Sequence, residues 1–204
     1  MLQVMMALRI LRLAFGDMWQ ELWTILVVQL FLLFAIVLVI PGPPAILALF
    51  YYGNQIAHEE PANERDFLKA ITQYWAPAWR WGFMNILIVG LLTGDYYLIG
   101  NLIGNPNTAY FIQGLYITLL VAWFILQLFV IPFLFEQKQP SVMQALRNAA
   151  VFVGKNLIFV VTLALLLVLS LFIGVLAFML TFAFGGAFVA FASNRAVLKD
   201  LTAD

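Results

Sequence analysis

The sequence predicts an all-α fold, a polytopic transmembrane helical bundle, and composition and segment length both indicate it. Hydrophobic residues make up 65% of the 204 residues and charged residues only 10%, whereas soluble domains are about half apolar and about a quarter charged. Several uncharged runs approach the roughly 20 residues that cross a bilayer as a helix. A soluble fold could not bury so much apolar surface, so we expect a single transmembrane domain over residues 1–204, solvated in part by lipid.

The first span is expected at residues 23–40, an apolar run with two polar interruptions. It ends at the Pro-Gly-Pro-Pro sequence of residues 41–44, because prolines remove backbone donors and favour a turn. A short apolar stretch follows at residues 45–57, and the chain then becomes polar over residues 58–66. These features predict a helical hairpin that returns to the side where it started.

The middle of the chain predicts a second hairpin. Its spans are expected at residues 79–92 and 109–131, joined by a loop over residues 93–107 that is rich in Gly and Asn, and closed by Pro132. After a polar segment at residues 136–141, the chain carries no charge from residue 157 to residue 192.

This last uncharged stretch is too long for one span. A straight helix over residues 151–193 would be about 64 Å long, and the hydrocarbon core is only about 30 Å thick. The segment must therefore fold back once, and its middle predicts a turn near Gly174.

The distribution of basic residues orients these segments. If six spans leave both termini inside, all ten Lys and Arg residues fall on the cytoplasmic side and none falls in the outer turns. This follows the positive-inside rule and predicts a multi-pass protein of the inner (plasma) membrane with cytoplasmic termini. Four spans remain an alternative, in which residues 45–57 and one C-terminal half are re-entrant.

A weak internal repeat accompanies this topology, with units at residues 1–58, 59–133 and 134–204. Ala7-Leu8-Arg9 and Ala145-Leu146-Arg147 each precede a glycine and a span at the same spacing. Each unit is expected to combine a cytoplasmic amphipathic helix, an outward span and a return span. Such amphipathic helices are expected to lie in the membrane interface. The alternative is that helical elbows of this kind are common to membrane proteins.

The candidate functional residues within the spans are neutral, because ionisable groups, which mark ion pathways, are nearly absent there. The candidate amides are Gln29, Asn85, Gln113 and Gln127. They either line a polar path for a neutral solute or bond between helices, and packing is the commoner role. Asp95 is the single charge expected on the outer side; it is a candidate outer contact or a solvated loop acid.

The sequence offers little for catalysis. One cluster has the composition of a metal site: His58 with Glu59, Glu60 and Glu64. A single His and carboxylates on a flexible loop make a poor metal site, so a hydrated polar loop is the better interpretation. There is no Cys, and no HExxH, GxSxG or Walker sequence. We therefore expect no enzyme activity and no cofactor or metal. A net charge of zero without a basic stripe gives no reason to expect nucleic acid.

The segment Pro44-Ala45-Ile46-Leu47-Ala48-Leu49-Phe50-Tyr51 resembles the Pro-Ala-x-x-Ala-Leu-Tyr stretch of the YesL-like family of bacterial polytopic membrane proteins. Asp66-Phe67, Pro132 and Lys155-Asn156 also stand where that family has them. Just before this segment the chain differs from the family pattern, because Gly42 and Pro43 stand where the family usually has Thr and Gly. Members of the family are often associated with carbohydrate uptake systems, and the family carries no established catalytic residues.

These observations predict a non-enzymatic accessory or assembly subunit associated with carbohydrate uptake. The alternative is a small permease for a neutral solute, which the amides in the spans would allow. The expected partners are the lipid bilayer and either a membrane transport complex or further copies of the chain.

Overall fold

The computed structural model describes residues 2–176 and 179–201, and within these ranges every regular element is a helix. In chain order the helices are α1 (Leu2–Gln20), α2 (Leu22–Val37), α3 (Gly42–Ala57), α4 (Glu64–Gln73), α5 (Trp75–Leu102), α6 (Pro106–Phe135), α7 (Val142–Lys155), α8 (Leu157–Leu176) and α9 (Met179–Leu201). The predicted all-α class is confirmed for the described part of the chain.

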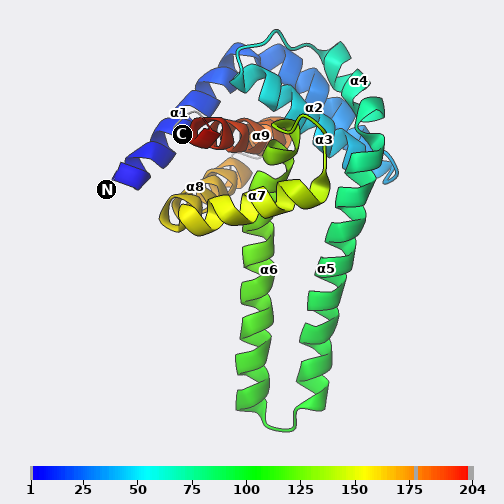
Figure 1. The fold of residues 1–204 in the computed structure, drawn as a ribbon, viewed down its shortest axis with the longest axis vertical. Coiled ribbons are helices and arrows are strands. Elements are labelled where there is room, and N and C mark those ends of the chain that lie inside the picture. The colour runs from blue at the N-terminus through cyan, green and yellow to red at the C-terminus, as the bar shows by residue number, and fades with distance from the viewer. Residues whose placement is uncertain (1, 177–178, 202–204) are drawn as a thin grey trace.

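The helices form two parts, which we call the hairpin and the head. The hairpin is α5 with α6, of 28 and 30 residues, or about 42 and 45 Å of helix. It extends away from the head, which contains the other helices (Figure 1). Helices α7 and α9 run across the base of the hairpin, and the last turns of α6 are buried in the head.

Helix α3 lies at the centre of the head and packs against α2, α4, α5, α6 and α9. Its close packing on α9 depends on Gly53, because a Cβ at this position would lie only 2.9 Å from Cδ1 of Phe191. The neighbouring Tyr52 is fully buried, and its ring stacks on Phe191 with the centroids 6.1 Å apart. The short apolar stretch predicted after the proline turn is therefore the core helix of the head.

Two pairs of consecutive helices meet at sharp bends. The axes of α1 and α2 differ by 91°, and those of α7 and α8 by 101°. The bends lie at corresponding places in the predicted units 1–58 and 134–204. The threefold repeat itself and the interfacial position of α1 and α7 stay predictions.

By length and composition, two helices of the described chain can cross a membrane, α5 and α6, or up to four segments if each bent pair counts as one span. The described part of the chain is thus helical with two to four candidate spans. These do not confirm the six-span topology, which stays a prediction.

The predicted loop at residues 93–107 is wrong in extent. Helix α5 continues to Leu102, and only residues 103–105 connect it to α6. The Asn101 side chain donates to the Tyr97 carbonyl within the helix, so this polar residue does not end it. Asn105 instead caps α6 by accepting from the backbone of Asn107 and Thr108, and Pro106 fits the first turn.

Two further predicted boundaries change. Pro132 lies inside α6, which continues to Phe135, so this proline does not close the span. The predicted turn at Gly174 falls within the last turn of α8, which ends at Leu176. Helix α9 begins at Met179, and the connection between them lies outside the described residues.

Candidate functional site

The hairpin holds three of the four candidate amides, and it brings two of them together. Gln127 on α6 accepts a hydrogen bond from the Trp81 indole of α5, with Nε1 and Oε1 2.9 Å apart. Asn85 on α5 accepts from the Trp123 indole of α6 at 3.0 Å, and its Nδ2 lies 3.4 Å from Oε1 of Gln127. We call these four residues the seam. Each tryptophan donates to an amide on the opposite helix, so the seam joins α5 to α6 through polar contacts.

One donor of the seam lacks a partner. Gln127 is 9% exposed, and no described group accepts from its Nε2. An unpaired amide in an apolar surrounding costs free energy, and a bridging water or lipid oxygen at the base of the hairpin would remove that cost.

The third hairpin amide, Gln113, lies farther toward the tip and bonds to the backbone. Its Nε2 donates to the Tyr96 carbonyl of α5 at 3.1 Å. Gly100 makes this contact possible, because a Cβ there would lie 2.6 Å from the same nitrogen. Gln113 therefore ties the two helices together near the tip, apart from the seam.

Gln29 lies in the head. It is 6% exposed on α2, and its amide faces Gly186 of α9, where a Cβ would lie 3.1 Å from its Nε2. Its Oε1 has no hydrogen-bond partner among the residues that the structure describes. The four amides thus lie at helix contacts in three places: the seam, the outer part of the hairpin and the contact of α2 with α9.

Asp95 is half-buried on α5, within the helix and not in a loop. It forms no ion pair with any other described side chain. Its proposed role as an outer contact stays a prediction.

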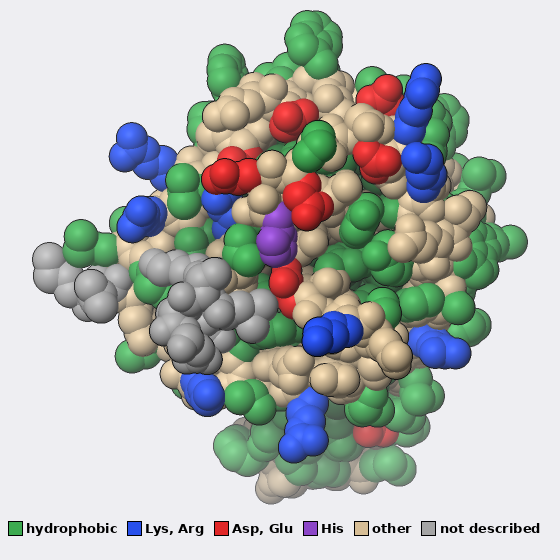
Figure 2. Space-filling model, turned by 45° about the horizontal axis from the view of Figure 1, so that its top comes forward, with side chains coloured by type: hydrophobic (Ala, Val, Ile, Leu, Met, Phe, Trp, Pro, Cys, Tyr) green, Lys and Arg blue, Asp and Glu red, His purple; other side chains and the backbone are tan. Residues whose placement is uncertain are grey.

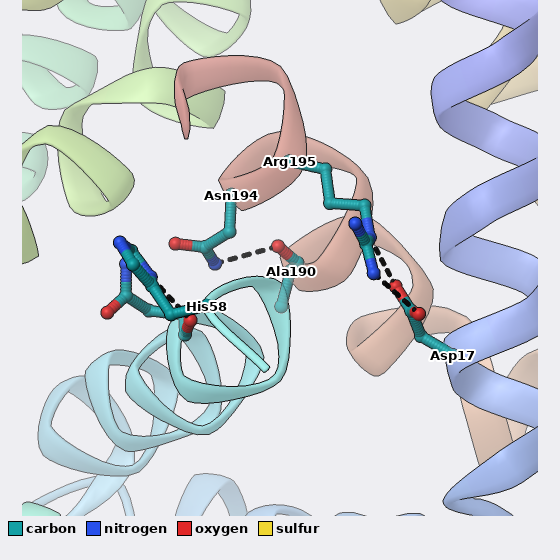
Figure 3. A network of polar contacts seen from close by, with 6 residues as sticks. Asp17, His58, Ala190, Asn194 and Arg195 are labelled. Carbon is teal, nitrogen blue, oxygen red and sulfur yellow. Dashed lines mark hydrogen bonds and ion pairs between the residues drawn. The ribbon is translucent and has the colours of Figure 1, made fainter. Parts of the chain in front are cut away.

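An ion pair with two hydrogen bonds joins α1 to α9 in the head. Arg195 of α9 donates twice to Asp17 of α1, with Nε–Oδ2 at 2.5 Å and Nη2–Oδ1 at 2.8 Å (Figure 3). Both side chains are largely buried, at 20% and 14% exposure. Two parallel bonds of this kind fix the relative position of α1 and α9 as well as their charges.

A second polar group surrounds His58 at the end of α3. Its Nδ1 lies 3.0 Å from the Asn54 carbonyl, and its Nε2 lies 3.6 Å from Oε1 of Glu136. The Asn54 amide donates to the same Glu136 oxygen at 2.7 Å. Glu136 follows α6, so this group ties the base of the hairpin to α3.

The adjacent aromatic rings strengthen the same junction. Tyr51, Tyr74 and Phe135 form a cluster with centroid separations of 5.0 to 5.6 Å. Burial, followed by the nearby Tyr51 hydroxyl, raises the pKa of Tyr74 above its usual value. Tyr74 therefore stays neutral, and its ring packs on Tyr51 of α3 and Phe135 of α6.

Sequence reasoning missed these two head contacts. It grouped His58 with the glutamates next to it in the chain, whereas the structure pairs His58 with Glu136. Within the described residues no group of three or more His, Cys, Asp or Glu side chains is placed to hold a metal ion. The available signal for Asp17 and Arg195 was their position beside apolar runs, but their 178-residue separation gave no reason to pair them.

The contacts therefore hold helices together at four places: the seam, the Gln113–Tyr96 bond, the Asp17–Arg195 pair and the Glu136 junction. Comparison of the chain with protein-family models, with curated proteins and with solved structures gives no match.

Proposed function

We propose that this chain is a membrane-anchored, non-enzymatic accessory or assembly subunit, and the exposed hairpin carries this proposal. In α5 only Ala78 and Gly82 are buried by the rest of the chain. Beyond the head, the outer faces of both helices expose large apolar side chains, including Phe83, Leu87 and Phe111. The chain does not cover this surface itself, so lipid or the spans of a partner must cover it.

The length and charge of the hairpin support its insertion. The parts that project from the head, residues 83–102 and 106–126, each extend over about 30 Å, which matches the hydrocarbon core. They contain no Lys or Arg, and Asp95 is their single charge. Since basic residues favour the cytoplasmic side, we propose that the tip faces outward and that the head, with both termini, lies on the cytoplasmic side of the inner membrane.

The predicted six-span topology adds α2, α3, α8 and α9 as further spans, and the four-span alternative makes some of them re-entrant. Helix α9 runs across the hairpin in Figure 1, so it is not aligned with α5 and α6. This direction favours a topology in which only the hairpin crosses the bilayer and the head lies at the membrane surface. Both topologies place Asn105 outside and Asn63 inside. They differ at Ile40, which lies in the outer turn of the six-span topology and near the cytoplasmic surface in the hairpin topology.

Cysteine labelling separates them, because the chain has no Cys. Asn105→Cys should react with an impermeant maleimide in intact cells, and Asn63→Cys should react only after permeabilisation. Protection of Ile40→Cys supports the hairpin topology, and its labelling supports six spans. Protection of Asn105→Cys would contradict the outward tip in both.

The proposed association with carbohydrate uptake rests on the resemblance of residues 44–51 to the YesL-like family. The expected partner is therefore a bacterial sugar-transport complex. Affinity purification of the full chain in a mild detergent should recover a stoichiometric membrane partner. Recovery of the chain alone would count against an accessory role, and co-purification of two differently tagged copies would indicate a homo-oligomer.

The permease alternative requires amides that face a solute path. In the hairpin, Asn85 and Gln127 instead bond to tryptophans of the facing helix, which supports a packing role. Proteoliposomes test the alternative directly. If the chain takes up a labelled sugar and Gln127→Leu slows this uptake, the result would favour a permease. Absence of uptake across a broad panel of sugars would rule out the permease function.

A further inference from the structure

Helix α1 has an outer face that the rest of the chain leaves uncovered. Its inner face is buried against the head through Ala7, Ile10 and Ala14. Residues that follow one another by three or four positions share a face of a helix. The opposite, exposed face accordingly carries both large apolar and basic side chains: Met5, Leu8, Arg9, Arg12, Phe15 and Trp19.

The two arginines of this face are neighbours, and no described acidic side chain pairs with either of them. Arg9 and Arg12 are three positions apart, which places like charges side by side. Neither forms an ion pair with another described residue. The nearest acids along the chain are engaged elsewhere: Asp17 pairs with Arg195, and Glu21 accepts from the Tyr52 hydroxyl at 3.2 Å. An anion from outside the chain would therefore relieve the repulsion between the two guanidinium groups.

The place of α1 in the fold indicates the source of that anion. The N-terminal end of α1 lies at the level of α7, where the hairpin leaves the head (Figure 1), and α1 packs on the strongly apolar α8. Lys and Arg side chains lie mostly toward the edges of the head, with most acidic side chains nearer the middle of the visible face (Figure 2). Basic side chains at the rim would lie close to lipid headgroups.

The combination of apolar and basic side chains on the outer face of α1 also fits a phospholipid. Exposed Leu8 and Phe15 suit the boundary between headgroups and acyl chains, where amphipathic helices bind. Arginine donates two parallel hydrogen bonds to a phosphate and is well suited to this ligand. A soluble acidic peptide would match the arginines but would leave the apolar side chains beside them, such as Leu8 and Phe15, exposed.

We propose that the outer face of α1 is a binding surface for anionic phospholipids of the cytoplasmic leaflet, with Arg9 and Arg12 holding the headgroup phosphate. Leu8 and Phe15 contact the upper part of the acyl chains. This proposal rests on the proposed membrane insertion with a cytoplasmic head, but not on the accessory role, because it concerns the lipid that surrounds the chain and not a protein partner.

The test uses the full chain in a mild non-ionic detergent, with phosphatidylglycerol and phosphatidylcholine of identical acyl chains added in equal amounts. Native mass spectrometry counts the bound lipids of each class. The wild-type chain should prefer phosphatidylglycerol. The Arg9→Gln/Arg12→Gln variant should lose this preference, by about fivefold for each arginine and about 30-fold for both. The Arg9→Lys/Arg12→Lys variant should keep most of it, because the charge remains.

A matched control removes two positive charges from exposed side chains of α4, on the side of the head away from the hairpin tip, in Arg65→Gln/Lys69→Gln. This control should retain the preference for phosphatidylglycerol. An equal loss in the control would show that net charge and not α1 selects the lipid, and an unchanged preference in Arg9→Gln/Arg12→Gln would overturn the proposal as well. The melting midpoint without added lipid should be the same for all variants, since the substituted side chains are exposed. A large drop of this midpoint in Arg9→Gln/Arg12→Gln alone would show that the two arginines stabilise the fold, and this result would also overturn the proposal.

Discussion

Replacement of Asn85 by Leu removes the polar atoms of this seam residue and keeps the number and branching of its side-chain heavy atoms. The substitution removes the acceptor of the Trp123 indole, whose Nε1 lies 3.0 Å from Oδ1, and the weaker contact to Gln127 at 3.4 Å. An indole N–H left unpaired inside a protein costs about 1–3 kcal/mol, whereas interhelical hydrogen bonds in membranes contribute about 0.6 kcal/mol on average and at most about 1.7. We therefore expect Asn85→Leu to lower the free energy of unfolding by about 1–2 kcal/mol.

The assay is thermal unfolding of the purified chain in detergent, followed by tryptophan fluorescence. For a chain of this size the expected loss lowers Tm by about 2–8 °C. Asn101→Leu is the matched control, because Asn101 is exposed on the same helix and its side chain bonds only within that helix, to the backbone carbonyl of Tyr97. It should leave Tm nearly unchanged.

A double-mutant cycle isolates the bond between the helices. Asn85→Leu and Trp123→Phe each remove one partner, so together they should cost less than the sum of the single changes, with a coupling of about 0.5–1.5 kcal/mol. Additive effects, or a Tm of Asn85→Leu equal to that of Asn101→Leu, would refute the assignment of Asn85 to packing between α5 and α6.

Two further substitutions test the head. Asp17→Asn removes the charge that pairs with largely buried Arg195 and should destabilise the chain by about 3 kcal/mol; Asp17→Asn with Arg195→Leu should recover part of the lost Tm, and no recovery would argue against the pair. Gly53→Ala places a Cβ 2.9 Å from Phe191 and should cost about 1–3 kcal/mol. Gly90→Ala is the control, because its Cβ would meet nothing within 4 Å, and it should be neutral or slightly stabilising. Equal losses of Tm in Gly53→Ala and Gly90→Ala would contradict the close approach of α3 and α9.

The sequence alone determined the helical class and predicted a membrane environment. Both rest on composition, because a chain that is 65% hydrophobic has apolar surface that lipid would solvate, and in lipid its backbone must satisfy its hydrogen bonds internally. The sequence also located the hairpin approximately and identified its amides. It erred on the extent of the connection, because Gly and Asn signal a turn in general but Asn101 bonds within its helix.

Only the tertiary structure decided which polar groups meet. Hydropathy measures how a segment partitions between water and lipid, and it contains no information about the neighbour of a given side chain. The Asn54–Glu136 contact joins residues 82 positions apart, and the Asp17–Arg195 pair joins residues 178 apart. Such partners depend on the register and crossing of packed helices. The same dependence explains why α3, predicted as a short return span or a re-entrant segment, lies at the buried centre of the head.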